Sequence, residues 1–182
     1  MSTIEPGMTR AELGALVCET LERDGISVVL SGGAVVSIYS DNAYESYDLD
    51  MIPTGLARRV DAAMQELGFR KSRSRHWVHP HTRLWVEFPP GPVTVGKLQV
   101  TEFSEMQTTY GVLRLLAPTE CVMDRLASYY HWGDSQALEQ AIAVAHRHWV
   151  DLERIREWSC GEQSEDKLAD FLERLGDSAA PR

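Results

Sequence analysis

Hydrophobic residues in the first third of the chain alternate between helical spacing and short unbroken runs. Thr9 and Glu12 have the spacing of a capping box, and the apolar positions that follow recur at helical intervals until Gly25. These positions are Leu13, Leu16, Val17 and Leu21. The run from Val28 to Leu30 is continuous and apolar, which is typical of a buried strand. The pattern therefore predicts a helix that leads into a strand.

A second helix and a second strand are predicted directly after this run. The first strand ends at Gly32-Gly33, and apolar residues at helical spacing then continue to Tyr39. Residues 43–47 are predicted to be a loop, and residues 48–53 a strand that ends at Pro53, since proline donates no ladder hydrogen bond.

Shorter elements are predicted from residue 56 to residue 115. An amphipathic helix is expected over residues 56–67, ending at Gly68. Two strands around a turn at residues 79–81 follow, and in the second of them Leu84 and Val86 share one face while Trp85 and Glu87 share the other. Further strands are predicted at residues 98–101 and 112–115.

The pattern is helical from Pro118 onward. Pro118 suits the first position of a helix, and Asp134 is placed to cap a second helix. A third helix is expected at about residues 150–158, and a fourth begins at Ser164. The fold class is therefore predicted as α+β, with a short mixed sheet flanked by helices and then a C-terminal helical bundle. The predicted domains are residues 1–116 and 117–182.

Composition restricts the class of protein. Charged residues make up 25% and apolar residues 43% of the 182 residues, as in ordinary globular proteins, and no window approaches a membrane span. The net charge of −9 argues against non-specific nucleic-acid binding over the whole surface. Cys18, Cys121 and Cys160 are widely spaced, so we expect reduced thiols in a cytoplasmic protein.

Candidate chemistry is concentrated in residues 31–50 and at Glu87. Asp48 and Asp50 share one face of the predicted strand, roughly 7 Å apart, and two close carboxylates repel each other unless a cation lies between them. Gly32 and Gly33 allow the backbone to approach a ligand closely. Two-metal sites need a further carboxylate, and Glu87 is the best-placed acid on a neighbouring predicted strand. This pattern favours phosphoryl or nucleotidyl transfer.

These residues also carry a resemblance to a known family. The pattern Leu30-Ser31-Gly32-Gly33, then Asp48-Leu49-Asp50, then Trp85-Val86-Glu87-Phe88 resembles the DNA polymerase β-like nucleotidyltransferase superfamily, and is most similar to its minimal members related to AbiEii-type toxins. The resemblance implies a nucleotidyltransferase-like sheet, two Mg²⁺ ions held by Asp48, Asp50 and Glu87, and a triphosphate at Ser31, Gly32 and Gly33. It implies transfer of a nucleoside monophosphate from an NTP to a hydroxyl group, and the acceptor could be an RNA end such as that of tRNA, a protein, or a small molecule. The resemblance to toxins also makes an antitoxin protein a candidate partner.

The second half departs from the AbiEii-type pattern. AbiEii-type proteins carry a lysine on the first helix of the second half, whereas the comparable helix here offers Arg125, which we assign to nucleotide binding. Their later basic-acidic motif is represented here by Arg147 and Asp151. An alternative hypothesis is therefore a catalytically silent nucleotidyltransferase-like protein that binds a nucleotide or a partner.

Three other features have competing interpretations. The basic segment 70–76 is either a guide for a triphosphate or RNA end, or a solvated turn. His76, His79 and His81 have a spacing that zinc sites use, but we favour loop histidines because no cysteine is nearby. The aromatic cluster at residues 129–132 is predicted to belong to the core rather than to a base-stacking surface. No serine or cysteine has the context of a nucleophile.

Overall fold

The computed structural model describes residues 4–54, 60–74 and 76–178. Its helices are α1 (Arg10–Glu22), α2 (Gly33–Tyr39), α3 (Val60–Glu66), α4 (Pro118–Trp132), α5 (Ser135–Arg147), α6 (Leu152–Gly161) and α7 (Glu165–Ser178). Its strands are β1 (Val28–Ser31), β2 (Asp48–Pro53), β3 (Arg70–Lys71), β4 (Trp77–Val78), β5 (Trp85–Glu87), β6 (Thr94–Val95), β7 (Leu98–Gln99), β8 (Ser104–Thr108) and β9 (Gly111–Leu115).

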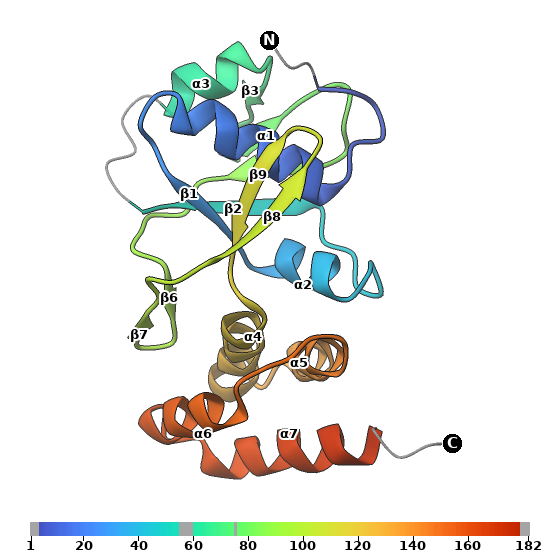
Figure 1. The fold of residues 1–182 in the computed structure, drawn as a ribbon, viewed down its shortest axis with the longest axis vertical. Helices are drawn as coiled ribbons and strands as arrows, with labels where there is room; N and C mark the ends of the chain where they lie inside the picture. Colours follow the sequence, from blue (N-terminus) through green and yellow to red (C-terminus); the bar gives the residue numbers. More distant parts are fainter. Residues whose placement is uncertain (1–3, 55–59, 75, 179–182) are drawn as a thin grey trace.

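A mixed sheet with the strand order β3-β4-β5-β2-β1-β9-β8 forms the centre of the first two thirds of the chain. The pairs β2/β5 and β1/β9 are parallel, and the other neighbours in this sheet are antiparallel. Strands β6 and β7 form a separate hairpin. Helices α1 and α3 lie on one side of the sheet, and α2 lies between the sheet and the later helices (Figure 1). The fold is thus of the α+β class expected from the sequence, with a short mixed sheet flanked by helices and a C-terminal helical region.

Local sequence explains the two elements that lead into the candidate site. Thr9 caps α1 through the predicted capping box, in which its side chain accepts from the Glu12 backbone N–H while the Glu12 carboxylate accepts from the Thr9 N–H. In β2, Leu49 and Met51 are fully buried, whereas the intervening residues, including Asp50, are half-buried. This alternation directs the apolar positions into the core under α1 and leaves the carboxylates on the opposite face.

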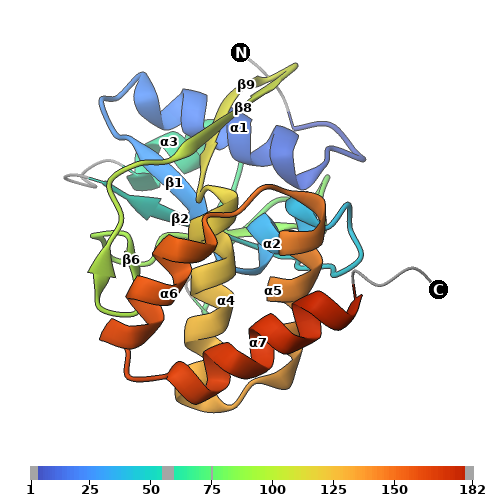
Figure 2. The ribbon, with the colours of Figure 1, turned by 60° about the horizontal axis from the view of Figure 1, so that its bottom comes forward.

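The four C-terminal helices pack beneath the sheet region. Helix α4 begins at Pro118 and packs against α5, whose N-terminus is capped by the Asp134 carboxylate, and α7 packs against α5 and α6. Helix α7 lies below α4 and α5 in Figure 1 and crosses in front of them in Figure 2. Phe171 is buried on the inner side of α7. Among the described residues, no helix has the length and apolar character needed to cross a bilayer.

The structure differs from the sequence-based prediction in several elements. Strands β3, β6 and β8 were not predicted, and the strand expected at residues 98–101 ends at Gln99. The helix expected over 56–67 covers Val60–Glu66, and residues 55–59 lie outside the described part of the chain. Tyr130 is buried as predicted, but the core assignment is wrong for Trp132, whose side chain is 85% exposed at the end of α4.

Candidate active site

Strands β2 and β5 place two aspartates and a glutamate on one face of the sheet. The strands are parallel neighbours, with Asp48 paired with Trp85 and Asp50 paired with Glu87. Side chains at paired positions of adjacent strands point to the same face. The structure therefore brings together the three carboxylates singled out in the sequence, and adds Trp85 beside them.

The glycine turn packs directly against these carboxylates. Ser31, the last residue of β1, pairs with Asp50, and Gly32 follows with φ 71° and ψ −152°. This backbone conformation is essentially confined to glycine. A Cβ at Gly32 would lie 2.5 Å from Asp50 Oδ2, and a Cβ at Gly33 would lie 2.9 Å from Ser46 Oγ. Both glycines are thus required for close approach between the turn and the side chains beside it.

Two of the three carboxylates have identified hydrogen-bond partners. Ser46 Oγ donates to Asp48 Oδ1, and His76 Nε2 lies 2.8 Å from Glu87 Oε1. Within the described ranges, no three His, Cys, Asp or Glu side chains are arranged as a metal-binding group. The donor set nevertheless fits Mg²⁺, which prefers carboxylate oxygens. The contact with His76 involves Glu87 Oε1, and Glu87 Oε2 has no hydrogen-bond partner within the described residues.

The electrostatics of Asp50 reflect this concentration of acids. Its pKa is raised to about 6, first by burial and then by the nearby charges of Asp48, Glu87 and Asp124, while Arg125 opposes the shift. A raised carboxyl pKa means that the negative charge is poorly compensated in the protein. The site therefore has an excess of negative charge that a bound cation would relieve.

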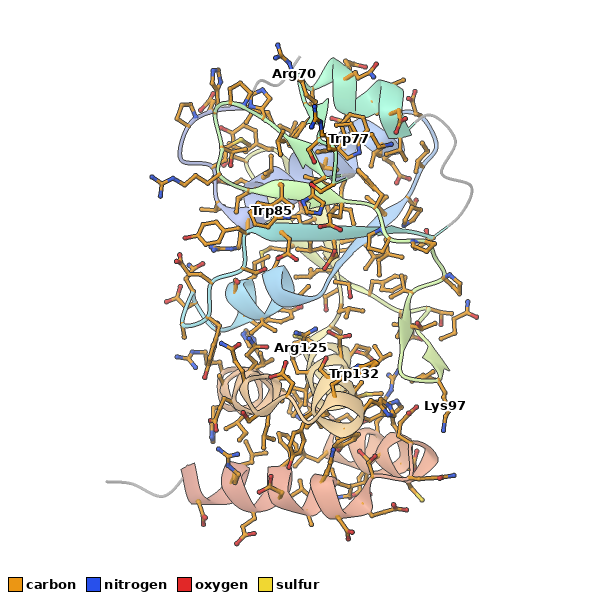
Figure 3. All side chains as sticks on the ribbon, turned by 180° about the vertical axis from the view of Figure 1, so that it is seen from behind. Arg70, Trp77, Trp85, Lys97, Arg125 and Trp132 are labelled. Atoms are coloured by element: carbon orange, nitrogen blue, oxygen red, sulfur yellow. The ribbon has the colours of Figure 1, made fainter. Side chains whose placement is uncertain are left out.

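Arg125 contributes a cation to this environment from α4. Its guanidinium forms an ion pair with the adjacent Asp124, and its side chain is 17% exposed. Figure 3 shows Arg125 on the side of the helical layer that faces the sheet. Its influence on the pKa of Asp50 places it within electrostatic reach of the carboxylates.

An aromatic stack borders the carboxylates. The Trp85 ring lies between those of His76 and Tyr47, with centroid distances of 5.9 and 6.4 Å and interplanar angles of 8° and 21°. The buried Trp85 Nε1 has no hydrogen-bond partner among the described residues. An unpaired buried donor is costly, so the indole N–H is a candidate contact for a bound ligand or water.

Sequence reasoning missed Ser46, His76 and Trp85 as members of the site. Ser46 precedes Asp48 by two residues, so the strand alternation was a usable signal for it. His76 was noticed as part of the basic segment and of the histidine group at residues 76–81, but not as a partner of Glu87. Its contact with Glu87 depends on the pairing of β4 with β5, which aligns Trp77 with Val86.

The basic segment and the other histidines lie around this site without converging on it. Lys71 in β3 forms an ion pair with Asp61 at 3.2 Å, and Arg75 lies outside the described residues. The His79 and His81 rings are in edge contact at 5.1 Å, and His81 Nδ1 lies 3.1 Å from the Ile4 carbonyl. His76 instead contacts Glu87 and is separate from the pair formed by His79 and His81.

The two residues of the later basic-acidic motif, Arg147 and Asp151, each make a local contact within the helical region. The Asp151 carboxylate accepts from the Arg154 backbone N–H and thereby caps α6. Arg147 Nη1 donates to the Ala143 carbonyl within α5. These contacts account for both side chains locally.

A cavity of about 490 Å³ opens where β2 and β5 begin. Its lining includes Arg10, Tyr47, Arg83 and Leu84, but none of the three carboxylates. The cavity therefore adjoins the ends of the carboxylate strands and is separate from the carboxylate face itself.

The sheet, the glycine turn ahead of the two-aspartate strand and the helical layer together define a nucleotidyltransferase-like fold. The chain is similar to the crystal structure of an antigenic nucleotidyltransferase-like protein from Paracoccidioides brasiliensis, with a TM-score of 0.67, 13% identity, and coverage of 95% of this chain and 91% of that chain.

Two further structures are of the antibiotic-resistance factor ANT(2'')-Ia. Its solution structure gives a TM-score of 0.44 at 13% identity, covering 89% of this chain and 90% of that chain. Its crystal structure in complex with adenylyl-2''-tobramycin gives 0.47 at 12% identity, covering 92% and 99%. The likeness to the Paracoccidioides protein is one of fold, and the two lower scores support no conclusion. No family model and no curated protein sequence matches this chain.

Proposed function

We propose that this protein is a metal-dependent nucleotidyltransferase that moves a nucleoside monophosphate from an NTP to a hydroxyl acceptor. The observation that carries the proposal is the pairing of β2 with β5, which puts Asp50 beside Glu87 while the Gly32 turn contacts the Asp50 carboxylate. A cluster of acids against a glycine turn suits a reaction in which metal ions and a triphosphate are held together.

In this proposal Asp48, Asp50 and Glu87 hold two Mg²⁺ ions. The ions, when bound, lower the pKa of the acceptor hydroxyl and neutralise charge on the triphosphate and the departing pyrophosphate. The raised pKa of Asp50 supports this role, because cation binding compensates the repulsion among Asp48, Asp50 and Glu87. His76 contacts Glu87 Oε1, which leaves Oε2 for this task.

The neighbouring residues bind and orient the nucleotide. The backbone at Gly32 and Gly33 receives the triphosphate, with Ser31 beside it. Arg125 neutralises phosphate charge from the side of α4, at the cost of its present pairing with Asp124.

The test is transfer of label from α-labelled NTPs to components of a cell extract, with Mg²⁺ or with EDTA. Asp48→Asn and Asp50→Asn are expected to abolish transfer while the protein stays folded. Asp41→Asn, at an exposed loop position with φ 53°, is the matched control and should retain activity. Full activity in either Asp48→Asn or Asp50→Asn contradicts the proposal.

The contact between His76 and Glu87 also favours a second candidate function. A protein that keeps Glu87 in this contact, and does not assemble three metal ligands, would bind a nucleotide without turning it over. Calorimetry with each NTP, with and without Mg²⁺, separates the two functions. Metal-dependent binding with no transfer to any acceptor favours the silent binding protein.

The resemblance to AbiEii-type toxins extends the proposal to a toxin that an antitoxin protein controls. Induced expression should then arrest growth, and Asp50→Asn should relieve the arrest at equal protein level. Equal growth arrest by the wild type and by Asp50→Asn excludes a toxin role that depends on transfer.

A further inference from the structure

Ser46 connects the glycine turn to the first aspartate of the site. Its backbone N–H donates to Ser37 Oγ at 2.8 Å, its carbonyl accepts from Arg10 Nε at 2.5 Å, and its hydroxyl donates to Asp48 Oδ1. Every polar group of Ser46 is therefore engaged, and its hydroxyl has the orientation needed to hold the Asp48 carboxylate.

Arg10 holds the loop that carries Ser46. Its side chain is 12% exposed, and Nη1 donates to Asn42 Oδ1 at 2.7 Å. Asn42 has φ 60°, a left-handed conformation that asparagine tolerates better than most residues, and its N–H donates to the Ser37 carbonyl. The guanidinium thus ties both ends of the 42–46 segment to the start of α1.

The same loop is connected to the glycine turn. Ser37 Oγ donates to the Gly33 carbonyl at 3.1 Å while it accepts from the Ser46 N–H. The absence of a Cβ at Gly33 gives Ser46 Oγ its space, since a Cβ there would lie 2.9 Å from it. The hydrogen bonds therefore run from Gly33 through Ser37 and Ser46 to Asp48.

We propose that Ser46 is a positioning residue that fixes the Asp48 carboxylate for metal binding, and that Arg10 keeps Ser46 in place. This inference rests on the proposed function. A hydrogen-bonded partner of a ligating carboxylate sets its orientation before the metal arrives, and loss of such a partner typically weakens metal affinity or activity about 10- to 100-fold. The Ser46 hydroxyl donates a hydrogen bond to Asp48 Oδ1. Asp48 Oδ2 has no hydrogen-bond partner within the described part of the chain and is therefore available to a metal ion.

The experiment measures Mn²⁺ binding by calorimetry in the absence of nucleotide, together with thermal unfolding of the same samples. Ser46→Ala removes the donor to Asp48, whereas Ser46→Thr keeps a hydroxyl. Arg10→Gln removes the charged group that holds the Ser46 carbonyl. The exposed Ser74→Ala and Arg156→Gln variants are matched controls for each type of substitution.

We expect Ser46→Ala and Arg10→Gln to weaken Mn²⁺ binding about 10-fold or more, with near wild-type affinity in Ser46→Thr and both controls. The apo variants should unfold cooperatively, and if Ser46→Ala does not fold, Arg10→Gln provides the comparison. A merely structural role would lower the unfolding temperature and leave the Mn²⁺ affinity unchanged.

Two results overturn the inference in distinguishable ways. Wild-type Mn²⁺ affinity in folded Ser46→Ala refutes the positioning role and leaves the proposed function intact. Absence of Mn²⁺ binding in the wild-type protein contradicts the proposed function and removes the inference with it.

Discussion

Asp50→Asn should change the pH dependence of stability in a direction that follows from the raised pKa of this carboxyl. The folded-state pKa is about 6, against an ordinary value of 3.8. As pH rises between these values, the unfolded chain releases this proton while the folded protein retains it. The carboxyl therefore lowers wild-type stability progressively through this window, and the loss is complete above about pH 6.

The magnitude follows from the size of the pKa difference. Each pKa unit corresponds to about 1.4 kcal/mol, which gives an upper limit of about 3 kcal/mol for Asp50. Asp50 is half-buried, and solvent screening reduces this to about 1.5 kcal/mol. For a chain of 182 residues this is a change of roughly 3–6 °C in unfolding temperature.

The assay is urea unfolding of the wild type and Asp50→Asn at pH values from 4 to 8, without divalent metal. The free energy of unfolding of the variant, relative to the wild type, should increase by about 1.5 kcal/mol between pH 4 and pH 7. Asp41→Asn controls for the general effect of removing one negative charge. A difference between Asp50→Asn and the wild type that is constant across this range would refute a pKa of Asp50 raised by burial and by the neighbouring acids.

Three further predictions address the glycine turn at Gly32, the Arg125 guanidinium, and the buried Glu162 carboxylate at the end of α6. Gly32→Ala should lower the free energy of unfolding by about 2 kcal/mol or more, because this backbone conformation is essentially confined to glycine and the added Cβ meets Asp50 Oδ2. Denaturant melts compare it with Gly25→Ala, where φ is also positive, at 74°, but no atom lies within 4 Å, and equal losses would contradict this account of Gly32. Arg125→Gln should raise the KM for the NTP about 10-fold or more in steady-state assays, and Arg125→Lys should have a smaller effect because lysine keeps the positive charge. An unchanged KM in Arg125→Gln would exclude a role of Arg125 in phosphate binding. Glu162→Gln should lower stability by about 1–3 kcal/mol, because this 2%-exposed carboxylate accepts from the Lys97 N–H at 2.8 Å and lies 3.0 Å from His131 Nε2. The 87%-exposed Glu153→Gln is its control in thermal melts, and equal stability of the two variants would exclude this role for Glu162.

Elements with a strong local signal were predictable from the sequence. The capping box at Thr9, the proline at the start of α4 and the Asp134 cap each depend on residues within one helical turn. Glu87 could be placed beside the aspartates because strand alternation separates it from the buried Val86. The α+β class followed from these elements.

Other features depend on contacts that a linear pattern does not encode. Strand β8 has no buried residue, so its sequence lacks the hydrophobic alternation that identifies strands. The His76 contact with Glu87 arises from pairing between short strands, and Trp132 faces solvent although its neighbour Tyr130 is buried. The close packing of Gly32 against Asp50 likewise required the three-dimensional structure.

The central claim is that Asp48, Asp50, Glu87 and the glycine turn form one metal and nucleotide site. A crystal structure with Mn²⁺ and a non-hydrolysable NTP, with the metal located by anomalous scattering, tests it most directly. The account predicts Mn²⁺ bound by oxygens of all three carboxylates, and the triphosphate against Gly32 and Gly33. Nucleotide bound elsewhere, or Mn²⁺ absent from these carboxylates at saturating concentration, would contradict it.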